Sequence, residues 1–219
     1  MRIKKLFPGH SGYSVNIVPF LITIISIYLL ASVFEAKAAV VTHSGTIDAQ
    51  TTWLSADVHR VTGTVTVSPG IVLTIEPGTV VKFNSGTSLD INGALYAVGN
   101  ESQKIVFTSY RDDSIGGDTN GDGFSASQPG DWGRISFSDS VTDSFTRLEH
   151  SVIRYGGSGS QGNVYINSAD IIVMLSDISY GSSYGIYIYT SSPLIEGNTI
   201  TGNSNGIYVQ YATPAIDGN

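Results

Sequence analysis

The chain has 219 residues, enough for one or two domains with a substantial core. It contains no cysteine, which excludes disulfides and thiolate metal sites, and its 25 glycines and 13% of charged residues suit a turn-rich all-β protein. From Ala39 onward there are 7 Lys or Arg and 17 Asp or Glu, a net charge of −10. This charge disfavours nucleic acid and anionic lipid as partners and is compatible with cation binding.

Residues 1–38 have the pattern of an export signal helix. Basic residues precede an apolar run, Ile17–Phe34, and Ala36-Lys37-Ala38 follows as a small-x-small cleavage pattern. The alternative is an uncleaved anchor, because about 18 apolar residues just span a bilayer. In both cases the rest of the chain is expected to be extracellular, on the cell surface or in the periplasm. After cleavage we expect no membrane contact.

Short strands are predicted along most of the chain after the leader. Residues 39–61 carry weaker signals, and we expect them to form an N-terminal cap over the open edge of the first coil. Segments rich in β-branched residues then alternate with turns such as Ser68-Pro69-Gly70. They predict strands at 65–67, 73–75, 80–83, 89–91, 95–98, 105–108 and 135–137. No convincing helical periodicity follows the leader, so the fold class is predicted to be all-β.

A repeat organises the last third of the chain. Val164-Tyr165-Ile166 recurs 22 residues later as Ile186-Tyr187-Ile188, and 21 residues after that as Ile207-Tyr208-Val209. A period of this length, built from short strands, is typical of a solenoid whose coils bury their apolar faces against one another. We therefore expect these triplets to pair in parallel and their Val and Ile side chains to be buried.

Other positions repeat with the same spacing. Leu148, Val173, Ile195 and Ile216 are predicted to be equivalent, and Asn198 and Asn219 are expected to form a ladder of amides along the coil axis. A coil that ends at Asn219 would leave backbone N–H and C=O groups unpaired. We therefore expect the native chain either to continue beyond this residue or to self-associate end to end.

Several segments resemble known β-helix proteins. Gly70–Phe83, Ile105–Ser109 and Gly130-Asp131-Trp132-Gly133 resemble the opening coils of bacterial extracellular right-handed parallel β-helix proteins. The C-terminal repeats are similar to those of the pectin-lyase-like superfamily and of the periplasmic copper-site maturation protein of nitrous oxide reductase. A chain without Cys and with only 2 Met is poorly suited to copper. The resemblance implies one right-handed parallel β-helix over 62–219 with a loop insertion at 109–130.

The insertion contains a candidate metal site. Asp118, Asn120 and Asp122 place oxygen ligands at alternate positions before a glycine, as in the first half of a calcium loop. The last position of an EF-hand loop would be a glutamate, and here it is Pro129. The pattern thus predicts at most a solitary Ca²⁺ site. The alternative is a polar turn without metal, because Asp, Asn and Gly all favour turns.

The central tyrosines of the three triplets form the second candidate site. If the flanking Val and Ile residues point into the coil, Tyr165, Tyr187 and Tyr208 must point outward and stack in a column. One interpretation is a carbohydrate-binding surface. The other is mutual support of neighbouring strands by aromatic pairs.

No catalytic residues are predicted. The resemblance implies that a lyase of this superfamily needs calcium-binding carboxylates beside a basic residue, and a hydrolase needs clustered aspartates. Arg111-Asp112-Asp113 lies in the insertion and matches neither set, and strand alternation should send Glu149 and His150 to opposite faces. We therefore expect a secreted or surface protein with a non-catalytic binding, adhesive or structural role, with polysaccharide or a cell-surface component as the candidate partner. The alternative is a polysaccharide lyase or glycoside hydrolase.

Overall fold

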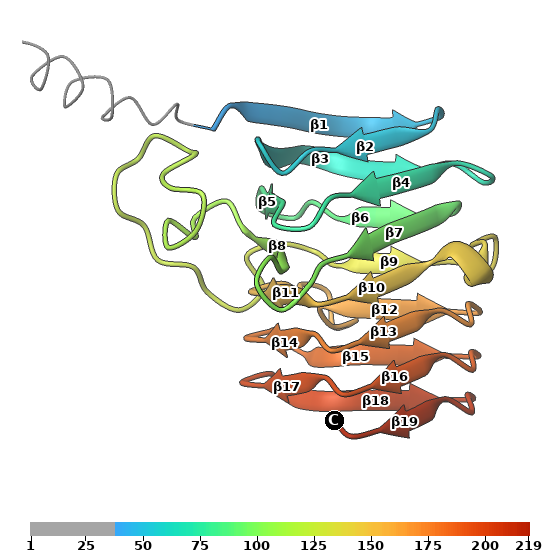
Figure 1. Cartoon of the computed structure of the whole chain (residues 1–219). Coiled ribbons are helices and arrows are strands. Elements are labelled where there is room, and N and C mark those ends of the chain that lie inside the picture. Colours follow the sequence, from blue (N-terminus) through green and yellow to red (C-terminus); the bar gives the residue numbers. More distant parts are fainter. Residues whose placement is uncertain (1–37) are drawn as a thin grey trace, which may run out of the picture. The chain divides into compact units, whose positions relative to one another are not determined.

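The structure is a computed structural model that describes residues 38–219, so all of the expected export signal but its last residue lies outside the described residues. The described chain forms a parallel β-solenoid of about 8 turns (Figure 1). Its one helical element is the 3-10 helix η1 (Asp143–Phe145), and no helix in this part of the chain is long and apolar enough to cross a membrane. The prediction of an all-β parallel solenoid is confirmed.

Each coil passes through three faces, two of which belong to one 12-stranded sheet. This sheet divides at β3 (Val58–Val67), because Val58–Val61 pairs with one strand and Val65–Val67 with another. The first branch continues through β5 (Val80–Phe83), β8 (Ile105–Ser109), β11 (Ser151–Arg154), β14 (Asp177–Ser179) and β17 (Thr199–Thr201). The second branch continues through β6 (Leu89–Ile91), β9 (Ile135–Phe137), β12 (Val164–Asn167), β15 (Tyr184–Tyr189) and β18 (Asn205–Gln210).

The third face is a separate 7-stranded sheet at the front right of Figure 1. Its strands, in spatial order, are β2 (Thr51–Trp53), β4 (Val72–Ile75), β7 (Ala94–Val98), β10 (Arg147–Glu149), β13 (Ile172–Met174), β16 (Leu194–Glu196) and β19 (Ala215–Asp217). Leu148, Val173, Ile195 and Ile216 are partners in this sheet, as the repeat predicts. The observed strands coincide with the predicted ones to within a few residues, except that β3 begins at Val58.

The core is a continuous column of aliphatic and aromatic side chains between the three faces. The predicted triplets pair in parallel from β12 through β15 to β18. Val164, Ile166, Ile186 and Ile188 are fully buried, as predicted. The prediction is wrong for the last triplet, since Ile207 is partly exposed and Val209 is 39% exposed, because β18 lies in the last coil of the described chain. Asn198 donates from Nδ2 to Oδ1 of Asn219 at 2.7 Å, which confirms the expected amide ladder.

Residues 39–61 take part in the solenoid. They form β1 (Val40–Ile47), β2 and the start of β3, and β1 pairs in parallel with β3 along most of its length. The 109–130 insertion leaves at the corner between β8 and β9, stands out from the stack and reaches along the earlier coils (Figure 1). There Nη1 of Arg60 donates to the carbonyl of Thr119 at 3.0 Å, so the insertion lies against the outer face of the first branch.

Candidate functional site

The predicted tyrosine column lies on the outer face of the second branch. Tyr165, Tyr187 and Tyr208 are register partners on β12, β15 and β18. Their ring centroids are 5.2 and 5.1 Å apart, with interplanar angles of 50° and 65°. Tilted contacts of this kind are electrostatically favourable between aromatic rings, so they stabilise the pairing of the strands. All three rings remain partly exposed, so the column is also open to a ligand.

Further tyrosines that the repeat did not single out enlarge this aromatic surface. Tyr184 stacks on Tyr208 with centroids 4.8 Å apart and planes at 19°. Tyr189 and Tyr211 form an edge-to-face pair at 5.9 Å. Outward alternation along β15, which has six residues, could have identified Tyr189, since it lies two positions after Tyr187.

The column changes from aromatic to polar above Tyr165. The register partners of this tyrosine in the preceding coils are Ser136, Asp90 and Thr66, on β9, β6 and β3. Together with residues from the adjacent column and corner they line a hollow of about 360 Å³. We call it the polar hollow; its lining includes Asp90, Asn92, Arg134, Ser136, Gln161, Tyr165 and Asn167.

The charged groups of the polar hollow are Arg134 and Asp90. The guanidinium of Arg134 lies 5.8 Å from the ring centroid of Tyr165, and its Nε is buried without a hydrogen-bond partner in the described chain. The carboxylate of Asp90 accepts a hydrogen bond from the hydroxyl of Ser136 at 2.6 Å. Burial raises the pKa of Tyr165, and the nearby Arg134 partly opposes that rise. The hollow therefore offers a cation, an anion and several amides, carried by the strands of the second branch and the corners beside them.

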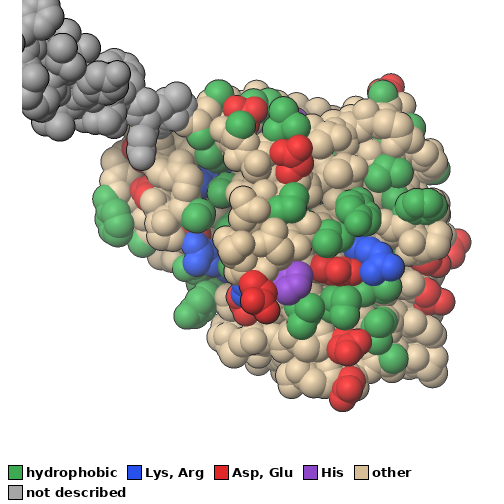
Figure 2. Space-filling view, in the orientation of Figure 1, with side chains coloured by type: hydrophobic (Ala, Val, Ile, Leu, Met, Phe, Trp, Pro, Cys, Tyr) green, Lys and Arg blue, Asp and Glu red, His purple; other side chains and the backbone are tan. Residues whose placement is uncertain are grey.

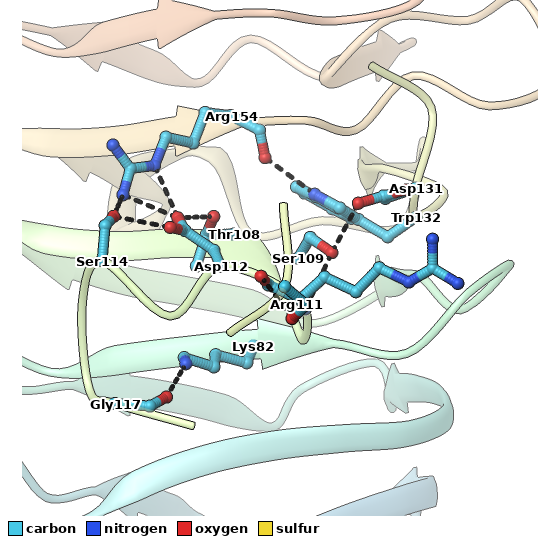
Figure 3. A network of polar contacts seen from close by, with 11 residues as sticks. Lys82, Thr108, Ser109, Arg111, Asp112, Ser114, Gly117, Asp131, Trp132 and Arg154 are labelled. Atoms are coloured by element: carbon cyan, nitrogen blue, oxygen red, sulfur yellow. Dashed lines mark hydrogen bonds and ion pairs between the residues drawn. The ribbon is translucent and has the colours of Figure 1, made fainter. Parts of the chain in front are cut away.

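A second polar cluster joins the insertion to the first branch (Figure 3). Asp112 is 5% exposed and accepts hydrogen bonds from Thr108 at 2.5 Å and Ser114 at 2.6 Å. It also pairs with Arg154 of β11, whose Nη2 lies 2.6 Å from its carboxylate. Burial alone would raise the pKa of Asp112, but the hydrogen bonds from Ser114, Thr108 and Arg154 outweigh burial and lower it. We call Thr108, Asp112, Ser114 and Arg154 the clasp.

Lys82 of β5 lies beneath the same insertion. Its side chain is fully buried, and Nζ donates to the carbonyl of Gly117 at 2.5 Å (Figure 3). Burial lowers the pKa of Lys82, against the opposing effect of the carboxylates of Asp112 and Asp113. Acidic and basic groups thus meet on this face, but Lys82 and Asp112 are shielded from solvent and have partners inside the protein. Their role is to fix the insertion against the strands of the first branch.

The predicted calcium ligands lie in one turn of the insertion. The carboxylate of Asp118 accepts hydrogen bonds from the backbone N–H groups of Asn120, Gly121 and Gly123. These hydrogen bonds lower the pKa of Asp118, and the one from Gly121 has the largest effect. Nδ2 of Asn120 donates to the carboxylate of Asp122 at 2.9 Å. Within residues 38–219, no group of three or more His, Cys, Asp or Glu side chains is arranged to hold a metal ion. Calcium binding at this turn stays a prediction.

A second hollow of about 360 Å³ lies at the corner between the 7-stranded sheet and the first branch. Glu101, Lys104, His150 and Asp177 line it, and Lys104 pairs with Asp177 at 2.6 Å. Figure 2 shows acidic, basic and histidine side chains gathered midway along this side of the molecule. Strand alternation does not decide where the side chain of His150 points relative to that of Glu149. His150 has a φ of 45°, which takes it off the strand, and both side chains are partly exposed.

The chain matches no protein-family model, no curated protein and no solved structure. Its candidate function therefore rests on the chemistry of its own surface.

Proposed function

We propose that this protein is a non-catalytic, glycan-binding parallel β-helix that acts outside the cytoplasm, in the secreted or surface-attached state. We further propose that it belongs with the pectin-lyase-like proteins, which its repeats resemble. The binding surface is the outer face of the second branch, from the polar hollow down the tyrosine column.

The observation that supports this proposal is the position of Tyr165. Its ring is the first of the tyrosine column and also lines the polar hollow, so aromatic faces and hydrogen-bonding groups form one continuous surface. A sugar presents apolar C–H faces flanked by hydroxyl groups, and it needs both kinds of contact. The three tyrosines of the column, Asp90 and Ser136 stand on strands of a single sheet, so the backbone that carries them is already ordered before a ligand binds.

Retention on immobilised neutral and acidic polysaccharides tests the proposal. The parent protein should be retained on at least one matrix, and Tyr165→Ser should lose most of that retention while keeping its circular dichroism spectrum. Tyr96→Ser is the matched control, because Tyr96 is 42% exposed on β7 of the 7-stranded sheet, outside the proposed surface. Equal retention of both variants, or no retention of the parent on any matrix, would contradict the proposal.

The second hollow, which Glu101, Lys104, His150 and Asp177 line, supports a second candidate, a polysaccharide lyase or glycoside hydrolase. Glu101 and His150 are the residue types that act as general acid or base, and both line an open hollow. The same polysaccharides distinguish the candidates. An enzyme would release unsaturated, ultraviolet-absorbing products or new reducing ends, and Glu101→Gln and His150→Gln would abolish them. Retention without any product would leave the binding function alone.

A further inference from the structure

Arg134 differs from every other arginine in residues 38–219, because its guanidinium makes no hydrogen bond or ion pair with another described residue. Arg60, Arg111, Arg147 and Arg154 each donate side-chain hydrogen bonds. The ion pairs in this part of the chain are Lys104–Asp177, Arg147–Glu149 and Arg154–Asp112, so Arg134 also lacks a carboxylate. The Nε of Arg134 is buried and unpaired among the described residues, which is costly, because this N–H has given up water without gaining a hydrogen bond.

The environment of Arg134 is suited to an anionic group. Its guanidinium lies over the ring of Tyr165, which is a stable position for arginine and leaves the in-plane N–H groups of Nη1 and Nη2 without a protein partner in residues 38–219. These donors form the planar fork that binds a carboxylate or a sulfate through two parallel hydrogen bonds. The polar hollow has a volume within the range of small-molecule sites.

Other groups of the hollow are suited to hydroxyls rather than to a second anion. Asp90 accepts only the hydroxyl of Ser136 from the described residues, which leaves its other oxygen as an acceptor. Asn92, Gln161 and Asn167 add amide donors and acceptors. A ligand that carries one acidic group and several hydroxyls would satisfy both charged side chains at once.

We propose that the polar hollow binds the acidic residue of a sparsely charged polysaccharide, whose neutral residues lie along the tyrosine column. This inference rests on the proposed glycan-binding function and names its ligand class. Sparse charge follows from two observations. The chain from Ala39 onward carries a net charge of −10, which repels a dense polyanion, and the hollow has one positive side chain, Arg134, and one negative side chain, Asp90, which do not form an ion pair with each other.

Single sugars test the hollow without the tyrosine column. Glucuronate, glucose 6-sulfate, glucose and acetate would be titrated into the full mature protein, with the ¹⁵Nε resonance of Arg134 as readout. Glucuronate or glucose 6-sulfate should bind saturably and at least about tenfold more tightly than glucose, a difference of about 1.4 kcal/mol. The tighter of the two identifies the acidic group as carboxylate or sulfate. Acetate should bind more weakly, because it has no hydroxyls for Asp90 and the amides.

Two arginine variants complete the test. Arg134→Gln should abolish the preference for the acidic sugar, with the fold checked by circular dichroism. Arg147→Gln removes the same charge from the 7-stranded sheet, where Arg147 pairs with Glu149, and should leave binding unchanged. Polygalacturonate, a dense polyanion, should be retained less well than a polysaccharide with isolated acidic residues.

The failure of this inference differs from the failure of the proposed function. If polysaccharides are retained but glucuronate and glucose 6-sulfate bind no better than glucose, the hollow does not recognise an acid and the proposed function stands. Acetate as tight as glucuronate, or tighter retention on polygalacturonate, would also overturn the inference. If no polysaccharide is retained at all, the proposed function fails first.

Discussion

Two arginines in this solenoid occupy similar local positions and have opposite surroundings. Arg154 lies 5.5 Å from the ring centroid of Tyr155, and Arg134 lies 5.8 Å from that of Tyr165. The insertion supplies Asp112 to Arg154, whereas no described residue supplies a carboxylate to Arg134. The arginine beside Tyr155 is thus paired with a carboxylate of the insertion, whereas the arginine beside Tyr165 has no such pair within residues 38–219, and we propose that it binds a ligand. Substitutions in the clasp, in the insertion and in the tyrosine column test this contrast.

The largest expected effect is at the clasp. Asp112→Ala leaves the guanidinium of Arg154 partly buried without its carboxylate, and losing one partner of a buried pair costs about 3–5 kcal/mol. Urea unfolding measures this loss. Asp139→Ala, in an exposed turn, and Arg134→Gln should each change stability by less than about 0.5 kcal/mol. A loss below about 1 kcal/mol for Asp112→Ala would mean that the clasp does not hold the insertion.

Acid should remove the same stabilisation. Because hydrogen bonds lower the pKa of Asp112 below its ordinary value, its ionised form stabilises the folded state above about pH 4. This contribution is lost as the pH falls further and Asp112 becomes protonated in the folded state. The difference in unfolding free energy between the parent and Asp112→Asn should be constant from about pH 8 to 5 and narrow below about pH 4. If the difference in unfolding free energy stays constant down to about pH 2, the stability lost in Asp112→Asn comes from packing and not from the charge of Asp112.

Calcium is expected to act on the same insertion. If Ca²⁺ binds at Asp118, Asn120 and Asp122, a concentration a hundredfold above its dissociation constant should add about 2.7 kcal/mol of stability. Thermal unfolding with calcium and with a chelator measures the gain. Asp122→Ala should remove most of it and Asp139→Ala none. An unchanged melting temperature in the parent protein would leave the segment as a polar turn.

The difference between the repeating coils and the non-repeating insertion also determines how much of the structure the sequence predicts. Strand positions, the register of Leu148 with Val173 and the tyrosine column follow from the period, because each coil repeats the alternation of the coil before it. The pairing of Asp112 with Arg154 follows no period, since it joins an insertion to a coil strand 42 residues later. The position of His150 depends on a left-handed corner residue, which strand alternation does not indicate.

The sequence does not indicate the polar hollow, for a related reason. It combines side chains from β6, β9 and β12 with the corner that contains Gln161, and no single segment carries its pattern. The register of a parallel solenoid could have placed Asp90, Ser136 and Tyr165 in one column, because their coils are adjacent. The missing partner of Arg134 could not have been foreseen, because it depends on how far every neighbouring side chain reaches.

The smallest expected effect on stability is in the tyrosine column. Tyr187 contacts Tyr165 and Tyr208 on either side, and its hydroxyl donates to Oε1 of Gln210 at 2.5 Å. Tyr187→Ser removes these cross-strand contacts at a partly exposed position and should cost about 0.2–1 kcal/mol. This loss is expected whether or not the column binds a ligand.

Binding must therefore be measured separately from stability. A ligand that lies along the column needs the ring of Tyr187, so Tyr187→Ser should weaken retention on polysaccharide at a temperature where the protein stays folded. The isolated acidic sugar should still bind, because the polar hollow does not include Tyr187. Tyr96→Ser should change neither measurement. If Tyr187→Ser is retained like the parent, the column only supports its strands, and any bound glycan leaves the hollow in another direction.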